Sequence, residues 1–266
     1  MKKLFALLSV LGVCATLEAK IVTQSVPYEH EGVKLIGLLV YDDEKTAQGK
    51  LPGVLVVPEW WGRTNYVKVR AHQLAELGYV AFAVDMYGEA FTTTDAKVAG
   101  EYAGKFYGSP LMANRARAGL DQLLASGLVD EKKVAAIGYC FGGSTVMALA
   151  YSGAPLAGIV SFHGGPIAAS AEAAERVRQN HTKFLICHGA VDPFVPKENL
   201  DGFLSSLDES RIDYQFIAYA GAKHAFSNPL ADKYAIQNHI DGIGYNDDAN
   251  MRSWEHMKLF LNELFQ

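Results

Sequence analysis

The sequence predicts an α/β domain, with a mainly parallel sheet that is covered by helices on both faces. Short apolar runs bounded by glycine, proline or aspartate alternate along the chain with stretches of helical periodicity. Half of the 266 residues are hydrophobic, which is enough to bury a large sheet in one domain. Strands that alternate with helices favour a parallel sheet between two helical layers.

The predicted elements begin with an antiparallel pair of strands at residues 21–28 and 33–41. A strand at 54–57 leads to a helix that Thr64 can cap and that stops at Gly78. Further strands are expected at 79–84, 134–137, 156–162, 184–189 and 214–219, and further helices at 111–125, 144–150 and 248–265. No linker, repeat or low-complexity segment interrupts residues 20–266, so we expect one domain.

Residues 1–19 have the pattern of a secretory signal peptide. Two lysines precede an apolar run at 4–13, which is too short for a stable membrane anchor, and Ala19 offers a cleavage site. Cys14 resembles the cysteine of a lipoprotein signal, but Val13 stands where a small residue is normally needed. We therefore expect a periplasmic or secreted protein rather than a lipid-anchored one.

Composition argues against several kinds of partner. The formal net charge is −5 and no basic stripe occurs, so nucleic-acid binding is not expected. No cluster of His, Cys and carboxylate residues has metal-ligand spacing, so we expect no metal and no other cofactor. The expected partner is a small molecule, and the sequence does not indicate an oligomeric state.

The segment at 138–143, GYCFGG, has the spacing of a turn that presents a nucleophile between a strand and a helix. Small residues on both sides of Cys140 let the strand and the helix approach closely. The N-terminus of the following helix favours a thiolate over a thiol. The alternative is a buried, inert cysteine in a glycine-rich turn.

An acid and a histidine follow this turn in the order that is typical of one class of hydrolases. Asp192 comes just after the predicted strand at 184–189, and His224 comes just after the predicted strand at 214–219. The order nucleophile, acid, histidine is that of α/β-hydrolases and differs from the orders in chymotrypsin and subtilisin. This order favours the nucleophile interpretation of Cys140.

Four segments together resemble the dienelactone hydrolase family, whose members are α/β-hydrolases that use a cysteine to open enol-lactones and related esters. These segments are PEWWG at 58–62, GYCFGG at 138–143, GAVDPFVP at 189–196 and HAF at 224–226. The resemblance extends over most of the chain after residue 19. It implies a hydrolase of carboxylic esters or lactones that resembles carboxymethylenebutenolidase.

The resemblance also implies a role for each matching residue. Cys140 would be the nucleophile, His224 the base and Asp192 the acid that orients it. Glu59 would contact the resting thiol and help to deprotonate it when substrate arrives. A partly desolvated carboxylate in that place can keep the thiol neutral and resistant to oxidation.

The expected chemistry is acyl transfer through a thioester intermediate. The backbone N–H groups of Trp60 and Phe141 are expected to form the oxyanion hole. A hydrophobic pocket is expected beside the nucleophile, built from residues that follow strand ends. Its candidate members are Trp61, Tyr87, His163 and Phe226.

The chain departs from the family in the expected substrate-binding segments. Members that act on dienelactone use arginines near the pocket, but neither 85–89 nor 225–229 contains one. Arg63 and Arg70 are expected at the surface. We therefore expect a less acidic ester or lactone as substrate, and a lid or an extra helix formed by residues 230–250.

Several alternatives remain open from the sequence. The protein could be a general esterase or thioesterase, or a non-catalytic binding protein with the same fold. A redox or thiol-transfer role would use Cys140 together with Cys187. A disulfide between them is not expected, because Cys140 belongs to a turn and Cys187 to a neighbouring buried strand.

Overall fold

The computed structural model describes residues 20–266 and confirms the predicted fold class. The expected signal peptide at 1–19 lies outside the described residues. An eight-stranded sheet has the order β1-β2-β4-β3-β5-β6-β7-β8. Its strands are β1 (Ile21–His30), β2 (Val33–Asp42), β3 (Leu51–Val57), β4 (Val80–Ala83), β5 (Val129–Tyr139), β6 (Gly158–Phe162), β7 (Lys183–Gly189) and β8 (Tyr214–Tyr219). The pairs β1–β2 and β2–β4 are antiparallel, and all other neighbours are parallel.

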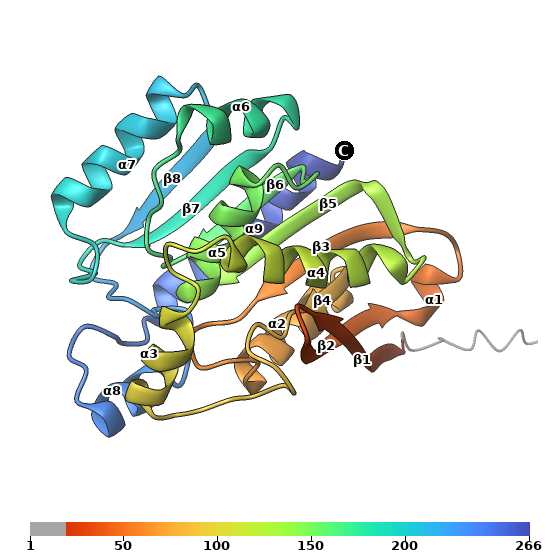
Figure 1. Cartoon of the computed structure of the whole chain (residues 1–266), viewed down its shortest axis with the longest axis horizontal. Coiled ribbons are helices and arrows are strands. Elements are labelled where there is room, and N and C mark those ends of the chain that lie inside the picture. The colour runs from red at the N-terminus through yellow and green to blue at the C-terminus, as the bar shows by residue number, and fades with distance from the viewer. Residues whose placement is uncertain (1–19) are drawn as a thin grey trace, which may run out of the picture.

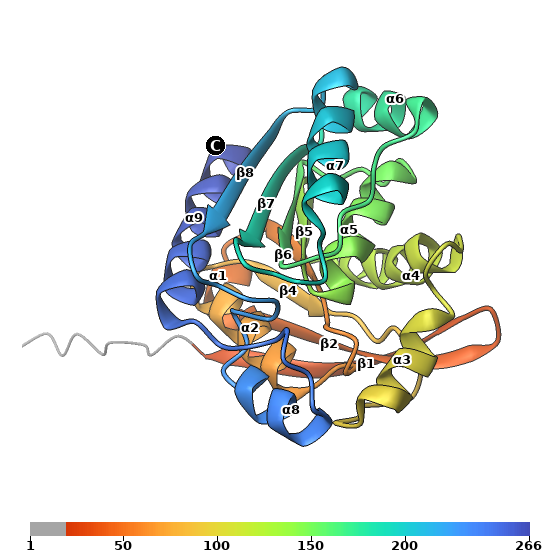
Figure 2. The same ribbon diagram turned by 90° about the vertical axis from the view of Figure 1, so that its left-hand side faces the viewer.

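Helices cover both faces of this sheet (Figures 1 and 2). One face carries α4 (Leu111–Ala125), α5 (Phe141–Tyr151), α6 (Ala171–Gln179) and α7 (Lys197–Glu209), and the other carries α2 (Asn65–Glu76) and α9 (Asp247–Phe265). Two further helices, α3 (Ala96–Gly104) and α8 (Ala231–Asn238), lie together beyond one edge of the layers. None of the helices described at 20–266 has the length and apolarity that crossing a membrane requires.

The sheet separates two hydrophobic cores, as a period-2 strand pattern requires. In β3, Leu55 and Val57 pack into the core beneath α4 and α5, whereas Val54 and Val56 pack into the core beneath α2 and α9. All four side chains are fully buried. Burial on both faces explains why this strand reads as a continuous apolar run.

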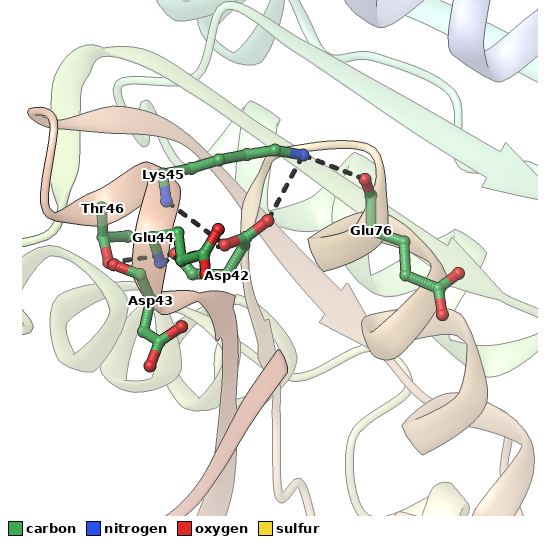
Figure 3. A network of polar contacts seen from close by, with 6 residues as sticks. All are labelled: Asp42, Asp43, Glu44, Lys45, Thr46 and Glu76. Atoms are coloured by element: carbon green, nitrogen blue, oxygen red, sulfur yellow. Dashed lines mark hydrogen bonds and ion pairs between the residues drawn. The ribbon is translucent and has the colours of Figure 1, made fainter. Parts of the chain in front are cut away.

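A polar network joins the end of β2 to the end of α2 through the short helix α1 (Asp43–Thr46), as Figure 3 shows. Asp42 caps α1, because its Oδ1 accepts hydrogen bonds from the backbone N–H groups of Glu44 and Lys45. The ammonium group of Lys45 then donates to the Glu76 carbonyl oxygen at the end of α2 (3.2 Å). A cation at a helix C-terminus is favourable.

Besides the short α1, three helices were not predicted, namely α3, α6 and α7. In α6 only Ala173, Ala174 and Val177 are buried, and in α7 only Phe203 and Leu207. In each of these helices the buried residues share one helical face, so the periodicity that indicates a helix is present in the sequence. The third, α3, likewise buries only two alanines. The predicted strand at 134–137 was too short, since β5 begins at Val129.

Candidate active site

The turn between β5 and α5 holds Cys140 in an unusual backbone conformation. Its φ is 53° and its ψ is −116°, a region that costs energy for any residue other than glycine. Two glycines make the turn possible. A Cβ atom on Gly138 would lie 2.0 Å from the Gly142 carbonyl oxygen, and one on Gly142 would lie 2.3 Å from the Val57 carbonyl oxygen.

The backbone N–H of Cys140 has two acceptors behind the turn. It donates to the Phe162 carbonyl oxygen (3.0 Å) and to Nδ1 of His163 (3.1 Å). The Cys140 side chain is partly exposed and lines a cavity. The nucleophile candidate is therefore anchored through its backbone while its thiol stays accessible.

Asp192 and His224 meet beside this turn, although 32 residues separate them in the chain. His224 Nδ1 lies 2.7 Å from Asp192 Oδ2, and both residues are buried. Phe194 steadies the carboxylate, because its backbone N–H donates to Asp192 Oδ1 (2.9 Å). The loop after α8 positions His224, because the His224 backbone N–H donates to the Gly242 carbonyl oxygen (3.2 Å).

The electrostatics of this group favour a protonated imidazole. Burial lowers the pKa of His224, but the charge of Cys140 and hydrogen bonds with Asp192 and Cys140 raise it more, to about 10. The structure thus brings Cys140, His224 and Asp192 together, as the sequence predicted.

Glu59 follows β3 and lines the same cavity, with only 3% of its surface exposed. Burial raises its pKa to about 7. Oε2 accepts a hydrogen bond from Asn228 Nδ2 (2.6 Å), whereas Oε1 is buried and has no partner among residues 20–266. The expected contact with the thiol of Cys140 is not among the hydrogen bonds of the described residues. Asn228, which the sequence analysis missed, is the partner instead.

The cavity has a volume of about 640 Å³ and mostly apolar walls. Besides Glu59, Cys140 and His224, its lining consists of Trp60, Trp61, Ala96, Lys97, Tyr107, Gly165, Phe194, Val195, Ala225, Asn228, Ala231, Tyr234, Ile240 and Ile243. The rings of Trp60, Trp61 and Tyr234 pack in a row, with centroids 4.8 and 4.7 Å apart. Residues from 231 to 243, in the segment that was expected to form a lid or an extra helix, supply part of this wall.

The prediction of the pocket lining is wrong for three of the four expected residues. Trp61 lines the cavity, but Tyr87, His163 and Phe226 are not among the lining residues at 20–266. Tyr87 supports the wall from behind, since its hydroxyl donates to the Trp60 carbonyl oxygen (3.0 Å). His163 and Phe226 are fully buried and pack against each other. A strand-end position places a residue near the site, and the covering loops decide whether it reaches the cavity.

Two backbone N–H groups near Cys140 are free to bind an oxyanion. Phe141 is the first residue of α5, so its N–H has no acceptor within the helix. The N–H of Trp60 makes no hydrogen bond in the described part of the chain. The Tyr87 contact fixes the neighbouring peptide through the Trp60 carbonyl oxygen.

The expectation that Arg63 and Arg70 lie at the surface is wrong, because both are only 6% exposed. Arg70 lies over the ring of Trp254 (4.8 Å) and donates to the Ser227 carbonyl oxygen (3.1 Å). Neither arginine lines the cavity, whose lining residues include Lys97 as the only lysine or arginine. Aromatic and carbonyl partners from distant segments make burial of Arg70 possible.

Cys140 and Cys187 are both free thiols, as expected. Cys187 is fully buried, which raises its pKa to about 12, and the hydroxyl of Tyr219 contacts its sulfur (3.6 Å). Such a thiol is unreactive at neutral pH. Residues 20–266 contain no group of His, Cys, Asp and Glu side chains that could hold a metal ion.

Comparisons with known proteins identify the family of this chain. The family model described as the dienelactone hydrolase family matches residues 38–265. The solved structure of the dienelactone hydrolase-like promiscuous phosphotriesterase P91, from metagenomic libraries, is 38% identical over 94% of this chain and 100% of its own, with a TM-score of 0.87. A putative carboxymethylenebutenolidase from Saccharolobus solfataricus is 24% identical over 89% of this chain and 97% of its own.

A third relative, a probable 2-oxo-3-(5-oxofuran-2-ylidene)propanoate lactonase from a Bradyrhizobium species, is 24% identical over 74% of this chain and 82% of its own. The family match covers nearly all of the described residues. This chain therefore belongs to the dienelactone hydrolase family, and it is an α/β-hydrolase that acts on ester or lactone bonds.

Proposed function

We propose that the protein hydrolyses carboxylic esters or lactones through Cys140, His224 and Asp192, by way of a thioester. One observation carries this proposal: the His224 imidazole lies 2.7 Å from the Asp192 carboxylate, and His224 and Cys140 line the same apolar cavity. An imidazole between an acid and a nucleophile is the arrangement that nucleophilic acyl transfer needs.

The reaction would begin from a thiolate paired with protonated His224. The thiolate attacks the ester carbonyl carbon, and the oxygen, now negative, accepts hydrogen bonds from the N–H groups of Trp60 and Phe141. The adduct then collapses to a thioester, and the leaving alkoxide or enolate takes the proton of His224. In the second half, His224 removes a proton from water, the hydroxide attacks the thioester, and the acid leaves as the thiolate is restored.

Glu59 is proposed to control the resting state of the thiol. Its buried oxygen, which has no partner in the described part of the chain, belongs to a residue that lines the same cavity as Cys140, and it can accept a proton when the pair with His224 is disturbed. Asn228 holds the other oxygen in place. A pKa near 7 lets Glu59 exchange a proton at neutral pH.

The lining of the cavity favours an uncharged substrate with an aromatic or alkyl group. Its walls are mainly aromatic and aliphatic, and no arginine is among its lining residues at 20–266. Esters of phenols or enols suit a thiol nucleophile, because a thiolate is itself easily expelled from the tetrahedral adduct unless the other group leaves more readily. Amides are therefore expected to be poor substrates.

Phosphotriesters form a second candidate substrate class. The relative P91, at 38% identity, is described as a promiscuous phosphotriesterase. A general esterase or thioesterase activity would use the same residues with a different preference among substrates. A purely binding role would require the absence of turnover on every activated ester.

The decisive experiment is a substrate screen with aryl esters, lactones, thioesters and a phosphotriester. Wild type is compared with Cys140→Ala and with Cys187→Ala, which removes the other described cysteine. The proposal requires Cys140→Ala to lose activity by at least about 10³-fold while Cys187→Ala stays near wild type. It also requires a covalent acyl adduct on Cys140, seen by mass spectrometry after rapid quenching. Comparable turnover by Cys140→Ala would refute it.

We also propose that residues 1–19 direct export and are removed. The N-terminal sequence of the mature protein, isolated from the periplasm or medium, tests this. A mature protein that begins at Met1 and stays in the cytoplasm would contradict it.

A further inference from the structure

A buried histidine that the proposed mechanism does not use lies directly behind the nucleophile. His163 follows β6 with a φ of 42°, a left-handed conformation that is uncommon for histidine. Its side chain is fully buried and its Nδ1 accepts the backbone N–H of Cys140 (3.1 Å). The same Cys140 N–H also donates to the Phe162 carbonyl oxygen (3.0 Å), so two acceptors share it.

The contacts of His163 fix where its proton lies. A backbone N–H can only donate, so Nδ1 must carry a lone pair, and the proton of the neutral ring is on Nε2. Nε2 then donates to Ser227 Oγ (2.7 Å). Ser227 Oγ is also hydrogen-bonded to Tyr66 OH (2.8 Å). The Tyr66 hydroxyl oxygen accepts a further hydrogen bond from Arg70 Nε (3.4 Å).

This chain of contacts joins the nucleophile turn to α2 through residues that are all buried. Arg70 closes it by donating to the Ser227 carbonyl oxygen (3.1 Å). His163, Ser227 and Tyr66 come from three segments that are far apart in the sequence. A buried polar network in which each member has a partner is rigid.

The ring of His163 also lies next to the ring of His224, edge to face, with centroids 5.3 Å apart. The titratable groups in contact with it are His224, Tyr139 and Cys140, and Tyr66 and Arg70 lie beyond Ser227. A proton on Nδ1 would oppose the Cys140 N–H and add a second cation beside protonated His224. Burial and the charges of His224 and Arg70 keep the pKa of His163 well below its usual range.

We propose that His163 is a positioning residue, whose Nδ1 holds the Cys140 peptide so that the thiol faces His224. It does not touch substrate. This inference rests on the proposed function, in which Cys140 is the nucleophile. The competing interpretation is that His163 merely fills space in the core.

Two substitutions separate these interpretations. In His163→Asn the amide oxygen can replace Nδ1, whereas in His163→Gln the polar group reaches toward the place of Nε2. We expect His163→Asn to alkylate Cys140 with iodoacetamide at nearly the wild-type rate. We expect His163→Gln to be slower at neutral pH by up to about 10²-fold, with the pH profile of alkylation shifted upward. Both variants are made in a Cys187→Ala background.

Equal alkylation profiles for the two variants would overturn the proposal, because a space-filling role gives no reason for their difference. Ser227→Ala provides a second measure: it removes the partner of Nε2 and leaves the acceptor at Nδ1, so a small effect is expected. If His163→Gln does not fold, the thermal unfolding of His163→Asn and its alkylation profile still decide, since Asn must retain both.

Alkylation needs no ester turnover, which keeps this test apart from that of the proposed function. If wild type hydrolyses no ester but shows the Asn–Gln difference, the proposed function fails and the role of His163 stands. If esters are hydrolysed through Cys140 and the two variants behave alike in kcat and in alkylation, only the role of His163 fails.

Discussion

Two regions meet at the cavity and are built on different principles. The nucleophile region, formed by the β5–α5 turn and its neighbours, is held by backbone contacts that leave no room for a side chain at Gly138 or Gly142. The cover, which we define as α3, α8 and residues 239–243, packs on Trp61 and Ala225 through an apolar cluster that contains Ala99, Ala231, Tyr234 and Ile243. Within the cover, Asn238 of α8 accepts from the Ala96 N–H at the start of α3 (2.8 Å) and donates to the Thr94 carbonyl oxygen just before α3 (3.0 Å).

The difference teaches where chemistry and substrate preference are encoded. The nucleophile region supplies Cys140, whereas the cover supplies apolar wall residues, among them Ala231, Tyr234 and Ile243. Close contacts between backbones tolerate few substitutions, but a cover that packs through apolar side chains can change its lining without disturbing the turn. Glu59 links the site to the cover, because its hydrogen bond reaches Asn228, whose Oδ1 accepts from the Leu230 N–H just before α8.

The largest effect is expected from Asp192→Asn, which should lower kcat for an aryl ester by about 10³–10⁴-fold because the His224 ring loses its orienting acceptor. Alkylation of Cys140 at neutral pH should slow as well, since loss of the carboxylate lowers the pKa of His224. Asp201→Asn, whose carboxylate pairs with Lys197 at the surface, is the matched control. A kcat within a factor of about ten of wild type would argue against the role of Asp192.

The steric basis of the nucleophile region predicts a strong effect of Gly142→Ala. The new methyl group would meet the Val57 carbonyl oxygen at 2.3 Å, so we expect the free energy of unfolding to fall by about 1–3 kcal/mol. Gly104→Ala in α3 is the control, because a Cβ atom there meets nothing within 4 Å. Denaturant titration measures both, and equal losses would break the distinction between the two regions.

Glu59→Gln tests the connection between the regions through pH. The folded protein holds a proton on Glu59 up to about pH 7, whereas the unfolded chain releases it near 4.5, so stability is lost as pH rises through this window. Gln removes this penalty. We expect the free energy of unfolding of Glu59→Gln, relative to that of wild type, to rise by up to about 3 kcal/mol from low to high pH.

Thermal unfolding of both proteins on either side of this window checks the expectation for Glu59. If the difference in unfolding temperature between the two proteins does not change with pH, Glu59 has the same pKa in the folded and the unfolded protein. Unchanged alkylation and hydrolysis rates in the same variant would remove Glu59 from the mechanism.

The smallest effect is expected in the cover. Asn238→Ala removes the hydrogen bonds to Ala96 and Thr94, each worth about 0.5–1.5 kcal/mol. We expect KM to rise several-fold with little change in kcat, measured by steady-state kinetics. Asn180→Ala is the control, since its amide donates to the Gly153 and Ala154 carbonyl oxygens away from the cavity. A fall in kcat alone would contradict the division of roles.

The parts of the site that the sequence predicted are those with a local signal. The turn around Cys140 is fixed by glycine spacing, and Asp192 and His224 follow strands whose carboxyl ends meet at one edge of a parallel sheet. The contact between Glu59 and Asn228 had no such signal, because 169 residues separate them in the chain. The same applies to His163, whose partners Cys140 and Ser227 come from other segments.

The sequence by itself determined the fold class, the turn that presents Cys140 and the order of the three residues that meet there, because steric limits and strand periodicity act over a few neighbouring residues. Only the tertiary structure decided which strand-end side chains line the cavity, which partner Glu59 takes and that Arg70 is buried. Those outcomes depend on which distant segments pack together, and their energies come from contacts that no short stretch of the chain contains.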